Sequence, residues 1–262
     1  LNEWIYMKVI VTGASGFLGT SLCRALKEAG HDVVELNSKN CDLTKDNGIY
    51  SGLIRIKKNQ GNSGVNIPGN TLSVNWRARL SEHLGFFNTE LIKSRSSNYL
   101  NSSINLEVLN SICSLMDIFP EREECIDLYN IIEELLDNLN NTSLWPFLYI
   151  KFELLFIERM GYGLDLSSCA VNGSTDNLNW VSPKTGRAVS ALGAKGWEDR
   201  LLKLPEFLGQ NEIKSVSKAD LLDSLKLTEF FLIKRVYSQY AKNLSSSRKR
   251  MFDYLSDDSF II

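Results

Sequence analysis

Three glycines near the start of the chain have the spacing of a loop that binds the phosphates of a nucleotide. Gly13, Gly16 and Gly19 follow the short apolar stretch Lys8 to Thr12, which reads as a buried strand. Glycine at these positions lets the backbone turn tightly and approach a pyrophosphate, and the N-terminus of the following helix then binds the anion. The spacing predicts dinucleotide binding where a strand precedes the loop and a helix follows it.

The neighbouring elements have this order. An amphipathic helix is predicted up to about Ala29, Gly30 ends it, and His31 to Leu36 reads as a second strand. The segment from Met7 to about Asn47 resembles the start of the NAD-dependent epimerases, a branch of the short-chain dehydrogenases. In this resemblance Asp42 takes the place of an acidic residue on the adenine side. The resemblance implies a truncated Rossmann-like βαβ start, with NAD or NADP as its ligand.

The rest of an oxidoreductase is missing. Epimerases of this kind exchange a proton through a tyrosine whose pKa is lowered by a lysine four residues later, and none of the nine tyrosines has a lysine there. The βαβ pattern also stops near Thr44, although a dinucleotide needs two such halves. We therefore expect no enzyme, no catalytic residue, no cofactor and a vestigial dinucleotide loop of Gly13, Gly16, Gly19 and Asp42. An NAD(P)-binding epimerase or dehydrogenase fragment is the alternative.

After Asn47 the pattern changes to short strands that carry basic residues. Strands are expected at 52–58, 72–80 and 86–94, and the second places Leu72 and Val74 on one face and Ser73 and Asn75 on the other. Burial with a period of two is typical of a small antiparallel barrel. The basic side chains of this region are candidates for a groove that follows DNA phosphates, namely Arg55, Lys57, Lys58, Arg77, Arg79, Lys93 and Arg95.

The net charge of -2 hides a strong segregation. Residues 48–105 contain seven basic and two acidic side chains, residues 106–160 three and eleven, and residues 214–250 nine and three. Two basic stretches that flank an acidic one favour an anionic partner. The alternative is that exposed strand faces are basic for solubility and edge protection.

Residues 104–160 read as three helices, of which the last contains Pro146 in its first turn and is apolar on nearly every side. Their carboxylates are expected to form a solvated face. A segment at about 161–197 contains a predicted hairpin around Pro183 to Gly186, and a helix with a capping box begins at Ser217. Cations expected to contact DNA or an acidic partner tail are Lys234, Arg235, Lys242, Arg248, Lys249 and Arg250.

The five cysteines show no framework spacing, and no apolar run approaches the length of a membrane span. A cytoplasmic chain with reduced thiols is therefore expected. Met7 looks like a more natural start than Leu1.

Six strings that occur in order resemble the bacterial RecO family over roughly residues 48–255. They are Gly52 to Arg55, Pro68 to Asn70, Trp76 to Gly85, Phe152 to Leu155, Gly161 to Leu166 and Val181 to Ser190. The resemblance implies an OB-fold barrel followed by a helical domain with a zinc-ribbon-like insertion. It also implies a nucleoid-associated protein that anneals single-stranded DNA and, with RecR, loads RecA onto DNA coated by the single-strand-binding protein, whose tail is a further partner.

The chain departs from this family in two places. The first strands of the family's barrel are replaced here by the epimerase-like segment, and the change falls near residues 43–47. This replacement predicts a partial barrel with exposed strand edges. In the insertion only Cys169 stands where some members have paired zinc-binding cysteines, and Asn172 occupies the position of its partner. Four ligands are needed for tetrahedral zinc, so we expect no metal and a packed Cys169 side chain.

The expected fold class is thus mixed α and β. It comprises a Rossmann-like fragment at 1–47, a partial OB-fold at 48–100 and a helical domain at 101–262 whose insertion lacks zinc ligands. A chimeric reading frame with no selected function as a whole is a further alternative.

Overall fold

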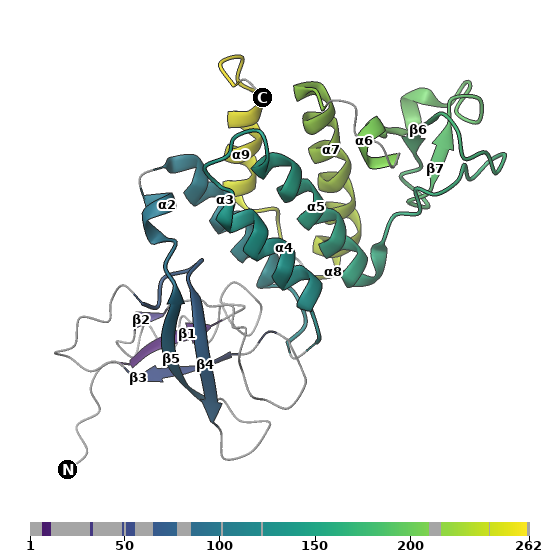
Figure 1. Cartoon of the computed structure of the whole chain (residues 1–262). Helices are drawn as coiled ribbons and strands as arrows, with labels where there is room; N and C mark the ends of the chain where they lie inside the picture. The colour runs from purple at the N-terminus through teal and green to yellow at the C-terminus, as the bar shows by residue number, and fades with distance from the viewer. Residues whose placement is uncertain are drawn as a thin grey trace, which may run out of the picture. The chain divides into compact units, whose positions relative to one another are not determined.

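The computed structural model of the chain describes residues 7–11, 32–33, 49, 51–55, 65–77, 85–100, 102–121, 123–209, 216–240 and 242–260. The chain forms two compact units, residues 1–140 and 141–262. The described residues form mixed α and β structure with two small sheets and a mostly helical C-terminal part (Figure 1). The mixed class expected from the sequence is confirmed at this level.

The first unit contains a sheet with the strand order β2-β1-β3-β5-β4. Its strands are β1 (Met7–Val11), β2 (Asp32–Val33), β3 (Ser51–Arg55), β4 (Thr71–Arg77) and β5 (Gly85–Lys93). The pairs β1–β2 and β3–β5 are parallel, whereas β1–β3 and β4–β5 are antiparallel.

Strand β1 pairs with β3 along its whole length, from Met7 opposite Arg55 to Val11 opposite Ser51. The sequence predicted that replacing the barrel opening would leave strand edges exposed. Strand β3 is not an edge, because β1 and β5 flank it, whereas the described sheet is open and ends in the edge strands β2 and β4.

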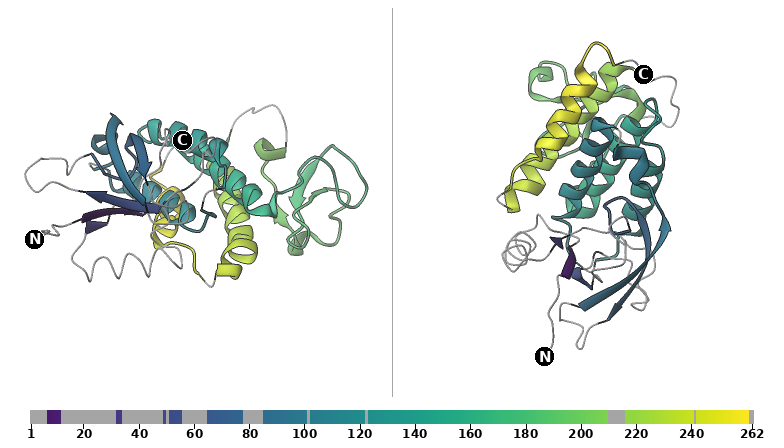
Figure 2. Two further views of the ribbon diagram at one scale, coloured as in Figure 1. Left: turned by 90° about the horizontal axis from the view of Figure 1, so that it is seen from below. Right: turned by 90° about the vertical axis from the view of Figure 1, so that its left-hand side faces the viewer.

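Strands β4 and β5 run side by side as a twisted ribbon (Figure 2). The alternation predicted for β4 is confirmed where side chains are described, since Leu72 and Val74 are buried and Asn75 is exposed. The loop before β4 packs on the buried face, where the Thr89 hydroxyl donates to the Asn66 amide oxygen at 3.0 Å. One face of the ribbon is therefore covered and the other is open.

The turn at Pro68 to Asn70 closes this loop against α2 (Ser96–Leu100), which contains Tyr99. Gly69 has a φ of 86°, and a Cβ at this position would lie 2.2 Å from the Tyr99 hydroxyl. The Tyr99 hydroxyl donates to the Pro68 carbonyl at 3.1 Å. Glycine is required here both for the left-handed backbone and for the close approach of Tyr99.

Three helices follow the sheet in the first unit. They are α2 (Ser96–Leu100), α3 (Ser103–Met116) and α4 (Ile126–Asp137). The buried apolar positions of α3 and α4 recur every three or four residues, which is typical of amphipathic helices. Asn105 at the start of α3 donates to the Asn98 carbonyl at 2.8 Å and so joins α3 to α2.

Arg95 joins the end of the ribbon to α4. Its side chain is fully buried, and it lies 2.7 Å from a Glu133 oxygen and 2.6 Å from an Asp137 oxygen. It also donates to the Thr71 hydroxyl and to the Gly69 carbonyl. Burial alone would raise the pKa of Asp137, but hydrogen bonds from Arg95 and Lys93 outweigh it and hold this pKa below its ordinary value.

The second unit is built on two long helical segments. Helix α5 (Trp145–Ile157) continues into a π-helical turn η2 (Glu158–Tyr162), and α7 (Lys218–Phe231) continues into η4 (Leu232–Tyr237) and α8 (Ser238–Tyr240). Helices α6 (Glu206–Gly209) and α9 (Ser246–Ser256) complete this set. The capping box predicted at Ser217 is present at the start of α7, and Pro146 lies in the first turn of α5.

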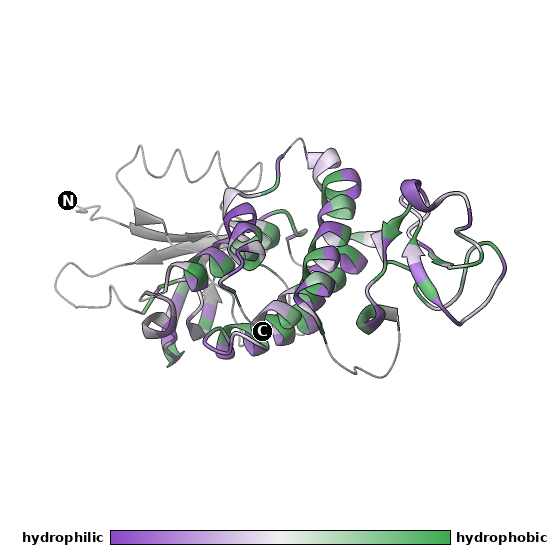
Figure 3. Cartoon of the chain, turned by 90° about the horizontal axis from the view of Figure 1, so that it is seen from above, coloured by the Kyte–Doolittle hydropathy of each residue, from purple (hydrophilic) through white to green (hydrophobic). Residues whose placement is uncertain are grey.

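The core of this unit contains a second buried arginine. Figure 3 shows hydrophobic and hydrophilic residues interspersed along the helices, yet most of α5 is buried, including the polar Glu153. The Glu153 carboxylate lies 2.6 Å from the guanidinium of Arg248, which is fully buried on α9. Glu229 is the second carboxylate partner of Arg248, also at 2.6 Å.

The insertion forms a three-stranded sheet with the order β7-β6-β8. Strands β6 (Leu178–Val181) and β7 (Ala188–Ser190) are the predicted hairpin, and β8 (Leu202–Lys203) adds to β6 after the short 3-10 helix η3 (Glu198–Arg200). The Gly186 amide donates to the Ser182 carbonyl at 2.8 Å and closes the hairpin turn.

The two cationic side chains at the end of the ribbon should differ sharply in their effect on stability. Arg95→Met leaves two carboxylates beside a buried site, and we expect a loss of about 3 kcal/mol in the free energy of unfolding. Lys93→Met removes only an exposed ion pair with Asp137, and its loss should stay below about 1 kcal/mol. Urea unfolding of the full chain checks this, and equal losses for the two variants would contradict the structural role of Arg95.

Candidate nucleic-acid interface

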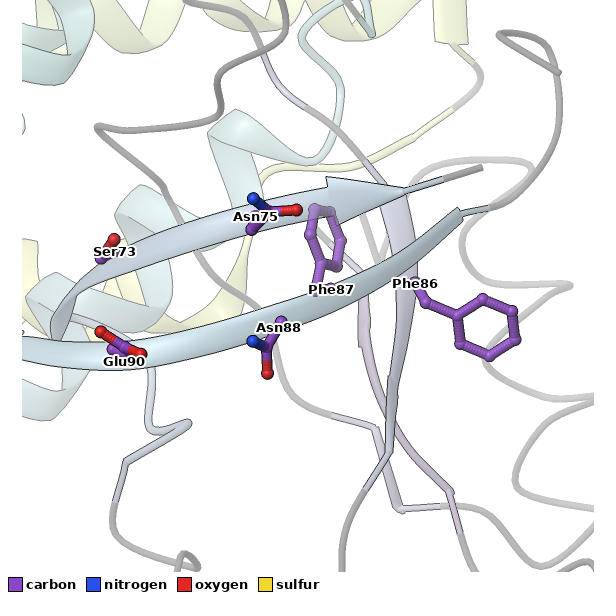
Figure 4. A pocket seen from close by; sticks show the side chains of 6 residues that line it. All are labelled: Ser73, Asn75, Phe86, Phe87, Asn88 and Glu90. Carbon is purple, nitrogen blue, oxygen red and sulfur yellow. The ribbon is translucent and has the colours of Figure 1, made fainter. Parts of the chain in front are cut away.

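The open face of the ribbon contains a shallow hollow of about 450 Å³ (Figure 4). The register places Asn75 directly opposite Asn88 and Ser73 directly opposite Glu90, and residues opposite each other in an antiparallel pair share a face. The six side chains that line the hollow are Ser73, Asn75, Phe86, Phe87, Asn88 and Glu90.

Phe86 stands out because 46% of its surface is exposed. Figure 4 shows its ring directed away from the ribbon, whereas the Phe87 ring is directed toward β4. An exposed aromatic ring is a stacking platform for a base or another flat group. The Asn75 and Asn88 amides each combine an acceptor oxygen with an N–H donor, and an ionised Glu90 only accepts. The hollow can thus hold a flat, polar-edged ligand.

The cations predicted for the groove in this unit differ in their exposure and in their ion pairs. Lys93 is exposed but paired with Asp137, and Arg95 is buried and paired with two carboxylates. Burial therefore removes Arg95 from the side chains that a phosphate can reach in this conformation. Arg55 and Arg77 lie in β3 and β4, and the register places Arg77 opposite Phe86. Lys57, Lys58 and Arg79 lie outside the described residues.

The second unit divides its predicted cations in the same way. Lys234, Lys249 and Arg250 are exposed, and Lys242 is half-buried. Arg235 is half-buried and donates to the Lys184 carbonyl in the hairpin turn. Arg248, in contrast, is buried between Glu153 and Glu229, whose carboxylates raise its pKa above the ordinary value despite the opposing effect of burial. Arg248 stabilises the helical core and is shielded from a partner.

Several carboxylates of the acidic middle region take part in ion pairs that the sequence did not predict. A solvated face was expected for these carboxylates. Asp137 is exposed and Glu133 half-buried, but both also neutralise Arg95, and the buried Glu153 neutralises Arg248. Part of the charge segregation in the sequence therefore reflects ion pairs within each unit. The aromatic and amide side chains of the hollow were missed, although Phe86, Asn88 and Glu90 alternate along β5 and so share one face.

The other predicted sites are placed as follows. The dinucleotide loop of Gly13, Gly16, Gly19 and Asp42 lies outside the described residues. Within the described part of the chain, no group of three or more His, Cys, Asp or Glu side chains could hold a metal ion. No described helix is both long and apolar enough to cross a membrane.

Cys169 lies in the insertion, at the position where some members of the family have a zinc-binding cysteine. Its side chain is 1% exposed, and its sulfur accepts hydrogen bonds from the Ser190 hydroxyl at 3.3 Å and from the Ser190 amide at 3.2 Å. The Asn172 side-chain amide donates to the Ser190 hydroxyl at 3.2 Å. The packed state predicted for Cys169 is confirmed.

The hydrogen bonds also change the acidity of this thiol. Burial alone would raise the pKa of Cys169, but the bonds from Ser190 and from the backbone amides of Asn172 and Val171 lower it from 9.0 to about 7.

Comparison with known proteins gives two family matches on different parts of the chain. The model for the C-terminal part of recombination protein O matches residues 102–244, and the model for the NAD dependent epimerase/dehydratase family matches residues 9–58.

Several curated relatives carry the name DNA repair protein RecO. The relative from Ruegeria sp. is 38% identical over 217 residues, which cover 82% of this chain and 89% of the relative. The relative from Rhizobium rhizogenes is 35% identical over 207 residues, covering 79% and 80%. One from Rhodopseudomonas palustris is 37% identical over 209 residues, covering 79% and 84%.

The effect of the hydrogen bonds on the pKa of Cys169 can be tested by removing one donor. Because the donors stabilise the thiolate, Ser190→Ala should raise the pKa of Cys169 from about 7 toward 9.0. A titration followed by the ¹³Cβ chemical shift of labelled cysteines measures this, and Cys113, which lies in the other unit, is the internal control. An unchanged pKa of Cys169 in the variant would show that Ser190 does not set it.

Proposed function

The chain belongs to the RecO family of DNA repair proteins, and from this membership we propose that it binds and anneals single-stranded DNA through the open face of β4 and β5. The observation that carries the proposal is the hollow on this face, which offers the exposed Phe86 ring beside two amides. Single-strand binders without sequence preference combine such stacking platforms with cations that follow the backbone.

Strands β3, β4 and β5 of the first unit are the proposed partial OB-fold. The antiparallel β4–β5 ribbon and the parallel β3–β5 pair support this reading, since a small barrel with crossed connections contains both kinds of pairing. In this proposal Arg55, Arg77 and the outlying Lys57, Lys58 and Arg79 bind phosphates. Lys93 contributes less because Asp137 already neutralises it.

The second unit is the proposed contact for other repair proteins. Its exposed cations Lys234, Lys249 and Arg250 suit an acidic segment such as the tail of the single-strand-binding protein, or a further stretch of DNA. RecR and RecA are the partners in loading the recombinase. The insertion is a zinc-ribbon-like hairpin that is held by hydrogen bonds around Cys169 in place of a metal. The protein acts without catalysis or cofactor, in the bacterial cytoplasm at the nucleoid.

The sheet cations can be tested against cations of the insertion. Arg55→Gln with Arg77→Gln should weaken binding of a fluorescent oligo-dT about tenfold at low salt and reduce the dependence of binding on salt. The matched control is Lys195→Gln with Arg200→Gln, which removes the same charge from exposed positions of the insertion and should change affinity less than about twofold. No binding of oligo-dT by the unaltered chain at low salt would refute the proposal.

A nucleotide site in the N-terminal segment is the second candidate. The epimerase match at residues 9–58 and the parallel pairing of β1 with β2 favour a Rossmann-like fragment. If it binds NAD or NADP, either ligand in excess over its dissociation constant should raise the melting temperature by several degrees. Gly16→Arg should abolish this shift, and no shift in the unaltered chain would support a vestigial loop. A chimeric reading frame would show neither activity.

A further inference from the structure

The hollow on β4 and β5 is built for the bases of a strand more than for its phosphates. The described side chains that line it are two phenylalanines, two asparagines, one serine and one glutamate, with no cation among them. Glu90 would repel a phosphate placed in the hollow, since both carry negative charge.

The ends of the face differ in charge. By register Arg77 is opposite Phe86 at one end, Asn75 is opposite Asn88 in the middle, and Ser73 is opposite Glu90 at the other end. A strand that lies along the face thus runs from the end that holds Arg77 and Phe86 to the end that holds Glu90. Phe86 and Glu90 are four residues apart on β5, about 13 Å along an extended strand, so one base cannot reach both.

We propose that the hollow binds unpaired bases of single-stranded DNA, one of them stacked on Phe86 at one end, and that Glu90 at the other end selects a base that carries an exocyclic amino group. The inference rests on the proposed binding of single-stranded DNA. An ionised carboxylate only accepts hydrogen bonds, and the cytosine amino group is a donor that a carboxylate recognises. Thymine presents a carbonyl oxygen at the corresponding position, which a carboxylate repels.

The test measures binding of the full chain to three oligonucleotides of equal length at mildly alkaline pH. They are oligo-dC, oligo-dT and an abasic strand that carries only sugar and phosphate. Oligo-dC should bind about three- to fivefold more tightly than oligo-dT, and the abasic strand at least about tenfold more weakly than either, because base stacking is lost.

Three variants assign these differences to residues. Phe86→Ala should weaken oligo-dC binding about tenfold and leave abasic binding unchanged. The matched control is Ile92→Ala on the same strand, since Ile92 is 57% exposed and does not line the hollow, and it should bind all three strands as the unaltered chain does. Glu90→Gln should bring the affinities for oligo-dC and oligo-dT to within about a factor of 1.5, because an amide both donates and accepts.

The outcomes separate this inference from the proposed function. Equal binding of the three strands, with Phe86→Ala equal to Ile92→Ala, would show that phosphates alone hold the strand, and would overturn the inference while single-strand binding stands. A persistent preference for oligo-dC in Glu90→Gln would overturn the role of Glu90. Should no strand bind at low salt, the proposed function fails and the inference fails with it. Circular dichroism of each variant verifies that the fold is retained.

Discussion

Each unit of this protein depends on one buried arginine and the carboxylates that neutralise it. Arg95 connects β4, β5 and the preceding turn to α4, and Arg248 connects α9 to α5 and α7. A guanidinium without a partner in such a place is strongly destabilising. The position of each arginine therefore fixes which acidic residues must face it, and with them the packing of the helices that carry them.

This constraint changes the meaning of the charge pattern. The basic strands and the acidic helices of the first unit read as two separate surfaces in the sequence, but Glu133 and Asp137 are partners of Arg95. Counting charges along a chain cannot distinguish an internal ion pair from an exposed patch, because the distinction depends on contacts between residues about 40 positions apart. Because Arg95 is paired with these carboxylates, the side chains that the open face of the ribbon offers to a ligand are Phe86 and the neighbouring asparagine amides.

Local patterns were predicted well and long-range ones poorly. The alternation of Leu72, Val74 and Asn75, the hairpin at 178–190 and the cap at Ser217 follow from periodicity and turn chemistry, which a short window of sequence contains. The burial of Arg95 and Arg248 does not, since it depends on carboxylates from other elements. The pairing of β1 with β3 was also unpredicted, because the sequence of β1 indicates a parallel neighbour and says nothing of its second edge. Family membership was recognisable from strings such as Pro68 to Asn70, and the Tyr99 contact explains why glycine stands in this one.

The central claim is that single-stranded DNA lies on the β4–β5 face of the first unit. Photocrosslinking of the full chain to a single-stranded oligonucleotide that carries 5-iodouracil, followed by mass-spectrometric mapping of the adducts, tests it most directly. The account predicts adducts on peptides that contain Phe86 or Phe87, because these rings line the hollow. Adducts confined to residues 141–262, with none on β4 or β5, would contradict it.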